Sequence, residues 1–154
     1  MTQTETEHLI HLSWDRTIDR PISVVFDVLT DLETYLPAWA KGPIAVRKET
    51  PGRTDVGTKL TVVARVAAIR VRGPYEVTRW HHPDVFGGRG VAGPFRFDEE
   101  YRLAAISDSR TMVHYEIGAT PRGPLRIVRG PLTKQLRTLI DGDLDRFKQL
   151  VESQ

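Results

Sequence analysis

The chain has 154 residues, of which 40% are hydrophobic and 27% are charged, and its formal net charge is +2. A chain of this length buries about 68–70% of the surface that it exposes when unfolded, so residues 1–154 are expected to form one domain with a sizeable core. It contains no cysteine, which excludes disulfides, thiolate catalysis and cysteine-ligated metal centres.

The first residues carry no sign of a targeting segment. Residues 1–7 are polar and acidic and are expected to be a disordered tail, since they lack the basic start and apolar centre of a secretory signal. No stretch approaches the roughly 18 consecutive apolar residues of a transmembrane segment. We therefore expect a cytoplasmic location. Aromatic residues are not interleaved with basic clusters, so nucleic-acid binding is not expected.

The first predicted element is a half-buried strand, because apolar and polar residues alternate from His8 to Asp19. Asp19-Arg20-Pro21 then predicts a helix start, since an Asp can accept hydrogen bonds from free helix N–H groups and a Pro suits the first turn. The helix is expected over about 22–30. Its buried residues would be Val25, Phe26, Val28 and Leu29.

A second short helix is expected directly after the first. Asp31 is the predicted cap of this helix, Pro37 its predicted end and Trp39 its apolar anchor.

Six further strands are predicted between Ile44 and Thr120, separated by clusters of turn-forming residues. The clusters are 51–55, Gly73-Pro74, 81–84, Gly93-Pro94 and 107–109. These connections are too short for crossover helices, so the strands are expected to pair antiparallel.

One long helix is predicted at the C-terminus, from about Pro124 to Glu152, because apolar residues recur there every three or four positions. Gly130-Pro131 lies inside this pattern. A proline in a helix interior removes a backbone hydrogen bond, so the helix either kinks there or its regular part begins there.

These elements predict an α+β fold, in which a curved antiparallel sheet of seven strands wraps around the C-terminal helix. A helix about 10 Å across does not fill a concave sheet along its whole length, so we expect a cavity for an apolar ligand. Pockets for small ligands are lined mainly by apolar and aromatic side chains. The residues expected to line this one are Trp14, Trp39, Val62, Tyr75, Phe86, Phe97, Tyr101, Tyr115, Val128, Leu132 and Leu136.

Several segments give the chain a resemblance to a known superfamily. They are 18–21 (Ile-Asp-Arg-Pro), 25–31 (Val-Phe-Asp-Val-Leu-Thr-Asp), Trp39, 56–58 (Val-Gly-Thr), 75–80 (Tyr-Glu-Val-Thr-Arg-Trp) and 143–150 (Asp-Leu-Asp-Arg-Phe-Lys-Gln-Leu). The chain resembles the START-like superfamily, also called the SRPBCC or polyketide cyclase/dehydrase and lipid-transport group. The resemblance implies a helix-grip fold and binding of a hydrophobic molecule. It implies no particular set of catalytic residues, because one fold hosts many functions.

Two charged residues fall in apolar rows of the predicted strands. Strict alternation points Arg16 and Glu99 at the cavity, where they could pair, hold a ligand carboxylate or enol, and perform acid/base chemistry if burial raises the pKa of Glu99. A bulge or a strand end would instead turn either side chain to water. Tyr75 and Tyr101 are candidate proton donors, although a buried tyrosine hydroxyl usually has a structural partner.

The histidines do not form a predicted metal site. His81-His82 precedes Pro83 in a turn, and His114 and Glu116 alternate against apolar neighbours, so they are expected to face solvent. We expect no metal and no cofactor.

The glycines at 87, 88 and 90 do not match a phosphate-binding loop, which requires Gly-Lys-Ser/Thr leading into a helix. We interpret Gly88, Gly90 and Ala92 as leaving volume beside Phe86, which would enlarge the cavity or permit a bulge.

Between Ile117 and Ile140 there are five basic residues and no acidic one; the five are Arg122, Arg126, Arg129, Lys134 and Arg137. They could meet an anionic membrane surface or an acidic carrier partner at the mouth of the pocket, or form an ordinary solvated face.

Two functions remain open from the sequence. The first is an enzyme of the cyclase/dehydrase type that binds a polyketide, lipid or aromatic compound. The second is a non-catalytic carrier or regulatory module. In either case we expect a monomer or homodimer with a hydrophobic small-molecule ligand.

Overall fold

The computed structural model describes residues 10–66, 69–93, 95–123 and 129–154. The predicted tail 1–7 and the predicted pocket residue Val128 lie outside this part of the chain. The elements are β1 (Ile10–Ile18), α2 (Ile22–Thr30), α3 (Leu32–Trp39), β2 (Pro43–Lys48), β3 (Lys59–Val66), β4 (Ile69–His81), β5 (Val85–Ala92), β6 (Phe95–Ser107), β7 (Arg110–Pro121) and α4 (Arg129–Glu152).

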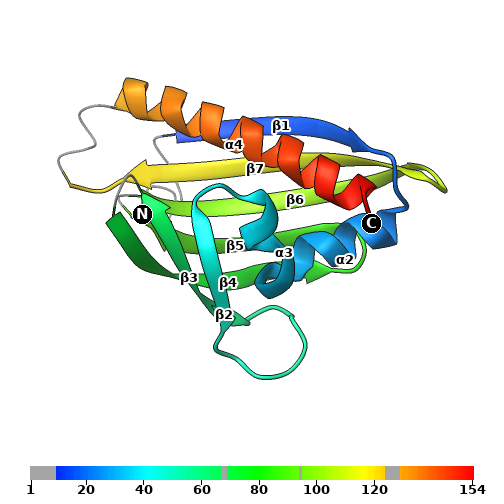
Figure 1. Cartoon of the computed structure of the whole chain (residues 1–154), viewed down its shortest axis with the longest axis horizontal. Helices are drawn as coiled ribbons and strands as arrows, with labels where there is room; N and C mark the ends of the chain where they lie inside the picture. Colours follow the sequence, from blue (N-terminus) through cyan, green and yellow to red (C-terminus); the bar gives the residue numbers. More distant parts are fainter. Residues whose placement is uncertain (1–9, 67–68, 94, 124–128) are drawn as a thin grey trace, which may run out of the picture.

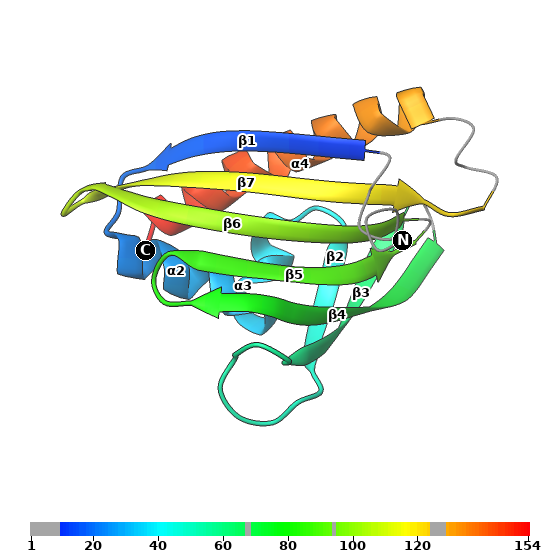
Figure 2. The same cartoon turned by 180° about the vertical axis from the view of Figure 1, so that it is seen from behind.

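The seven strands form one antiparallel sheet in the order β1-β7-β6-β5-β4-β3-β2. Helices α2, α3 and α4 lie on one face of this sheet (Figure 1). Seen from behind, the opposite face carries no helix formed by the described residues (Figure 2). We call these the inner and outer faces. The predicted α+β architecture, with a curved sheet and a long C-terminal helix, is confirmed.

The core lies between the inner face and the helices. Val25, Phe26, Val28 and Leu29 of α2 are buried, as predicted. The second half of α4 contributes Leu144, Phe147 and Val151, all of which are almost inaccessible to solvent. Burial of an apolar side chain of this size stabilises the fold by about 1.5–3 kcal/mol. The inner face is therefore tightly covered where α2, α3 and the end of α4 meet.

The two short helices differ in detail from the prediction. Asp19 does not cap α2: the N-cap is Pro21, with no side-chain cap, and Asp19 instead accepts a hydrogen bond from Arg110 Nε at 2.8 Å. Asp19 precedes the N-cap by two residues and has a cationic partner on β7. Asp31 does cap α3, since its Oδ1 accepts from the Thr34 N–H at 3.4 Å.

Pro37 does not end α3, which continues to Trp39. This proline removes one backbone hydrogen bond, but only two residues of the helix follow it. The last of them, Trp39, is buried and packs on Phe147, with ring centroids 5.0 Å apart.

Gly73-Pro74 is not a turn but lies within β4. Pairing between β4 and β5 begins at Tyr75, so the preceding residues of β4 pair with β3 alone, and proline is tolerated at such an edge. A Cβ on Gly73 would lie 2.0 Å from the Val91 carbonyl oxygen, so glycine permits this close approach.

Pro131 lies near the start of α4 and not in its interior. The helix starts at Arg129, which places Pro131 in its first turn. The missing N–H of a proline has no intrahelical partner there, so no kink is required.

Candidate functional site

Aromatic side chains form a continuous row across the inner face. Trp14 on β1 stacks on Tyr115 of β7, Tyr115 meets Tyr101 of β6, and Tyr101 stacks on Phe86 of β5. The successive ring centroids are 5.9, 4.4 and 6.1 Å apart. The strand register places these residues directly opposite one another, so the row follows from the alternation predicted for each strand.

Glu99 lies in the neighbouring row of the inner face, opposite Ile117 of β7 and Gly88 of β5. Its two carboxylate oxygens accept hydrogen bonds from two tyrosines. Tyr75 Oη donates to Oε2 and Tyr115 Oη donates to Oε1, each at 2.7 Å. Both distances are typical of strong hydrogen bonds to a charged acceptor.

Burial sets the electrostatics of this cluster. Removal from water raises the pKa of Glu99, and the two tyrosine hydrogen bonds oppose that rise because they favour the carboxylate. Burial, together with the charge of Glu99, raises the pKa of Tyr75, Tyr101 and Tyr115 well above the usual range of a phenol. The three tyrosines therefore stay neutral, and the hydroxyls of Tyr75 and Tyr115 are the hydrogen-bond donors to Glu99.

Gly88 allows this cluster to form. Tyr75 belongs to β4, and its ring must cross β5 to reach Glu99 on β6. A Cβ on Gly88 would lie only 2.2 Å from Tyr75 Cζ and Oη. The volume that we expected Gly88 to leave free beside Phe86 is thus occupied by the Tyr75 ring, which corrects that interpretation.

Arg16 does not join Glu99. Its Nη2 lies 2.5 Å from Asp141 Oδ1 and its Nε lies 3.1 Å from Asp145 Oδ1, both on α4. The Arg16 side chain is 20% exposed, whereas the two aspartates are more than half exposed. Arg16 therefore joins β1 to the middle of α4 at the margin of the inner face, and the pair with Glu99 considered from the sequence is not formed.

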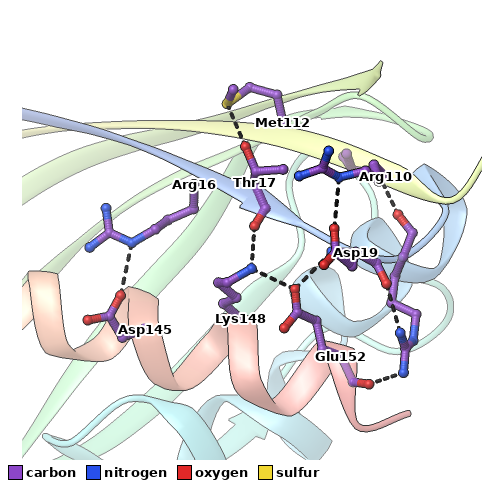
Figure 3. A network of polar contacts seen from close by, with 10 residues as sticks. Arg16, Thr17, Asp19, Arg110, Met112, Asp145, Lys148 and Glu152 are labelled. Carbon is purple, nitrogen blue, oxygen red and sulfur yellow. Dashed lines mark hydrogen bonds and ion pairs between the residues drawn. The ribbon is translucent and has the colours of Figure 1, made fainter. Parts of the chain in front are cut away.

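A second polar network fixes the end of α4 (Figure 3). Lys148 Nζ donates to the Thr17 carbonyl oxygen and to Glu152, each at 2.6 Å, and Glu152 accepts from the Asp19 N–H at 2.9 Å. Arg20 also contacts the Glu152 carbonyl oxygen. The C-terminal end of α4 is thereby tied to the junction between β1 and α2.

The first half of α4 covers the inner face less tightly. Leu132 and Leu136 are only partly buried, and so are Trp14, Val62 and Phe97 of the sheet. By contrast Tyr75, Phe86, Tyr101 and Tyr115 are buried. Trp39 is buried too, but it packs on Phe147 beneath α3. Leu132 and Leu136, in the first half of α4, thus pack on the core and still reach solvent.

Two hollows lie elsewhere on the described part of the chain. One of about 530 Å³ is lined mainly by outer-face residues, among them His11, Arg79, Arg89, Glu100 and Glu116. The other, of about 550 Å³, lies beside α3 and is lined by Trp39, Lys41 and Arg146. The predicted cavity between the sheet and α4 stays a prediction.

His81 and His114 lie away from the inner face, whereas His82 is exposed at the side of α2, with its ring centroid 5.1 Å from that of Phe26. His114 Nδ1 lies 2.7 Å from Asp15 Oδ1 and His81 Nδ1 lies 2.7 Å from Asp84 Oδ1, all on exposed or half-buried side chains. Among residues 10–66, 69–93, 95–123 and 129–154, no three His, Asp or Glu side chains gather as a metal site would require. No helix within the same ranges is long and apolar enough to cross a membrane.

Residues 10–152 match the family model described as polyketide cyclase / dehydrase and lipid transport. The chain belongs to this family. No curated protein sequence matches it.

Several solved structures have a similar fold. The ZhuI aromatase/cyclase of Streptomyces sp. R1128 is 16% identical with a TM-score of 0.78, covering 92% of this chain and 93% of that one. TTHA0849 of Thermus thermophilus is 18% identical with a TM-score of 0.76, over 93% and 97%. A START superfamily protein of Mycobacterium smegmatis is 12% identical with a TM-score of 0.66, over 91% and 98%. At these identities the likeness shows the helix-grip fold.

Some residues of this cluster were predicted from the sequence, and some of their partners were not. The sequence analysis named Glu99, Tyr75 and Tyr115 as inner-face residues. It did not predict that the two tyrosines bind the two oxygens of the Glu99 carboxylate. The signal available was Gly88, which alternation places on the inner face beside Glu99. Asp141 and Asp145 were not predicted as partners of Arg16, because they lie 125 and 129 residues away from it in the sequence.

Proposed function

We propose that this protein binds a hydrophobic small molecule on the inner face of its sheet, beside the first half of α4, and recognises a polar group of that molecule through Glu99. The observation that carries the proposal is the carboxylate of Glu99, which is held by Tyr75 and Tyr115 among otherwise apolar side chains. Membership of the polyketide cyclase/dehydrase and lipid-transport family supports the same class of ligand.

The cost of burying Glu99 favours a functional role for it. A carboxylate removed from water destabilises a protein unless hydrogen bonds compensate, and an apolar residue of similar size would fill the space without that cost. A carrier for a purely apolar lipid needs no such group. A ligand with a hydroxyl or an enol could donate a hydrogen bond to Glu99, which is the chemistry of a multi-ring or polyketide-like compound.

The catalytic form of the proposal assigns proton transfer to Glu99. Burial raises the pKa of Glu99, which is the direction of shift common in carboxyl groups that act as general acids. Tyr101 would supply a hydrogen bond to a developing oxyanion, whereas the Tyr75 hydroxyl already donates to Glu99. Arg16 is not assigned a clamp role, because Asp141 and Asp145 already bind its guanidinium.

Binding of a matched pair of probes tests the proposal. Naphthalene and 1-naphthol share one ring system, and only 1-naphthol has a hydroxyl donor. Binding is measured by the quenching of tryptophan fluorescence, to which Trp14 on the inner face contributes. Both probes should bind saturably, and 1-naphthol should bind about tenfold more tightly, because a hydrogen bond to a charged group contributes about 1.5–3 kcal/mol.

The Glu99→Leu variant should bind both probes equally, whereas Glu116→Gln on the outer face should retain the preference. If the wild type binds neither probe, the proposal is wrong. Binding of both probes without a preference would favour the carrier with an apolar pocket. Native mass spectrometry of protein purified from its own host would then identify a retained ligand.

A further inference from the structure

Three arginines crowd one face of the β3–β4 hairpin. Arg65 lies directly opposite Arg70 in the strand register, and Arg72 follows two residues later on the same side of β4. All three side chains are exposed on the outer face. Like charges directly opposite each other in an antiparallel pair are destabilising, so this arrangement works against the stability of the hairpin.

No carboxylate of the described residues neutralises these three arginines. Several other arginines are paired with acids, as Arg79 is with Glu100 and Arg110 with Asp19. The guanidinium donors of Arg65, Arg70 and Arg72 are thus available for an anionic partner, and a guanidinium matches the geometry of a phosphate.

More unpaired basic side chains lie at the same end of the sheet. The antiparallel order brings the end of β3, the start of β6, the end of β7 and the start of α4 together there, as the left side of Figure 1 shows. These elements add Arg96, Arg122, Lys134 and Arg137, all exposed and without a carboxylate partner within the described residues. Together with the three hairpin arginines we call them the basic end.

We propose that the basic end docks on the surface of an anionic phospholipid bilayer. Phosphate and carboxylate headgroups complement seven unpaired cations spread over several elements. Phe95, Phe97 and Leu132, which are partly exposed, belong to elements that begin at this end. A hydrophobic ligand moving between the inner face and a bilayer would pass from one apolar environment to another, a step that rests on the proposed function.

Attraction between the basic end and an anionic bilayer does not depend on a bound ligand, and binding should be reversible and sensitive to salt. A basic side chain close to an anionic membrane contributes about fivefold in affinity, so removing three should weaken binding about a hundredfold. The attraction falls off over about 8 Å at physiological ionic strength, so binding should weaken as salt is added.

Vesicle sedimentation with a charge-matched control tests the proposal. The test variant is Arg65→Gln/Arg70→Gln/Arg72→Gln, and the control is Arg47→Gln/Arg53→Gln/Lys59→Gln, taken from β2, the β2–β3 loop and the first residue of β3. Each lowers the net charge by three, from +2 to −1. The wild type and the control should sediment with phosphatidylglycerol/phosphatidylcholine vesicles and not with vesicles of phosphatidylcholine alone. The test variant should bind the anionic vesicles with about a hundredfold lower affinity.

Several outcomes would overturn the proposal. These are equal weakening of the two triple variants, equal binding to neutral vesicles, and no binding to vesicles combined with binding to poly-glutamate, which would indicate an acidic protein partner. If the triple variant does not fold, the single variant Arg70→Gln can be tested instead, and its affinity for anionic vesicles should be about fivefold lower than that of the wild type. The triple test variant should still bind 1-naphthol like the wild type, so failure of the naphthol test and failure of the vesicle test are separate results.

Discussion

Replacing Gly88 by alanine tests how the inner-face cluster is held together. The new Cβ would lie 2.2 Å from Tyr75 Cζ and Oη, well inside van der Waals contact, and Tyr75 is buried with little room to move. The ring must shift away from β5, which breaks its hydrogen bond to Glu99.

The expected cost follows from these two effects. Overpacking a core costs about 1–3 kcal/mol, and loss of a hydrogen bond to a charged group costs about 1.5–3 kcal/mol. The lower backbone entropy of alanine returns about 0.5–1 kcal/mol. We expect Gly88→Ala to lower the free energy of unfolding by about 2–5 kcal/mol, which corresponds to a fall in Tm of roughly 5–20 °C for a chain of this size.

Urea unfolding of four proteins measures this effect: the wild type, Gly88→Ala, Tyr75→Phe and the double variant. Tyr75→Phe should be costly in the wild-type background and nearly neutral in Gly88→Ala, since the hydrogen bond is already lost there. Gly130→Ala is the control, because nothing lies within 4 Å of the added Cβ, and it should be neutral or slightly stabilising. A Gly88→Ala protein within about 0.5 kcal/mol of the wild type, or strictly additive costs, would refute the reasoning.

Three other substitutions give independent predictions. Since burial raises the pKa of Glu99, the folded protein holds this proton more tightly than the unfolded chain, so Glu99 lowers stability as pH rises above its ordinary value of 4.5. Glu99→Gln should therefore gain stability relative to the wild type as pH rises from about 4 to 8, measured by urea unfolding at each pH, and a constant difference would contradict this assignment. Thr111→Val should lower the free energy of unfolding by about 1–3 kcal/mol, because the buried Thr111 hydroxyl donates to the Arg20 carbonyl oxygen at 2.8 Å. An unchanged Tm in thermal unfolding would show that this hydrogen bond does not stabilise the fold. Phe147→Ala should cost about 3–5 kcal/mol in chemical denaturation, and Leu139→Ala, on an exposed residue of the same helix, less than about 1 kcal/mol; similar costs would mean that α4 is not anchored by its buried side.

Local patterns predicted most of the elements. The alternation of β1 and β7 and the helical stripe of α4 gave elements that the structure confirms, because a buried face imposes a period of two on a strand and of about 3.6 on a helix. Prediction was weaker at Gly73-Pro74 and Pro37. Turn-forming residues were read there as interruptions, but an unpaired strand edge and a buried tryptophan decided the outcome.

Alternation also placed Glu99 and the tyrosines on one face of the sheet, but not their hydrogen bonds. Which hydroxyl reaches which oxygen depends on the register of β4, β5 and β6, and on the ring of Tyr75 crossing a strand at Gly88. Arg16 shows the same limit. Alternation predicted the face of the sheet on which Arg16 lies. It did not predict the ion pairs with Asp141 and Asp145, because those residues belong to a helix whose position is set by its packing against the sheet.

The sequence by itself determined the order of elements, the faces that they bury and the aromatic character of the inner face, since these depend on residues near one another in the chain. Only the tertiary structure decided that Glu99 is bound by two tyrosines, that Arg16 pairs with α4 and that unpaired arginines from separate elements meet at one end. Contacts of this kind join residues far apart in sequence, and their geometry is fixed only when the strands are in register and the helix is packed.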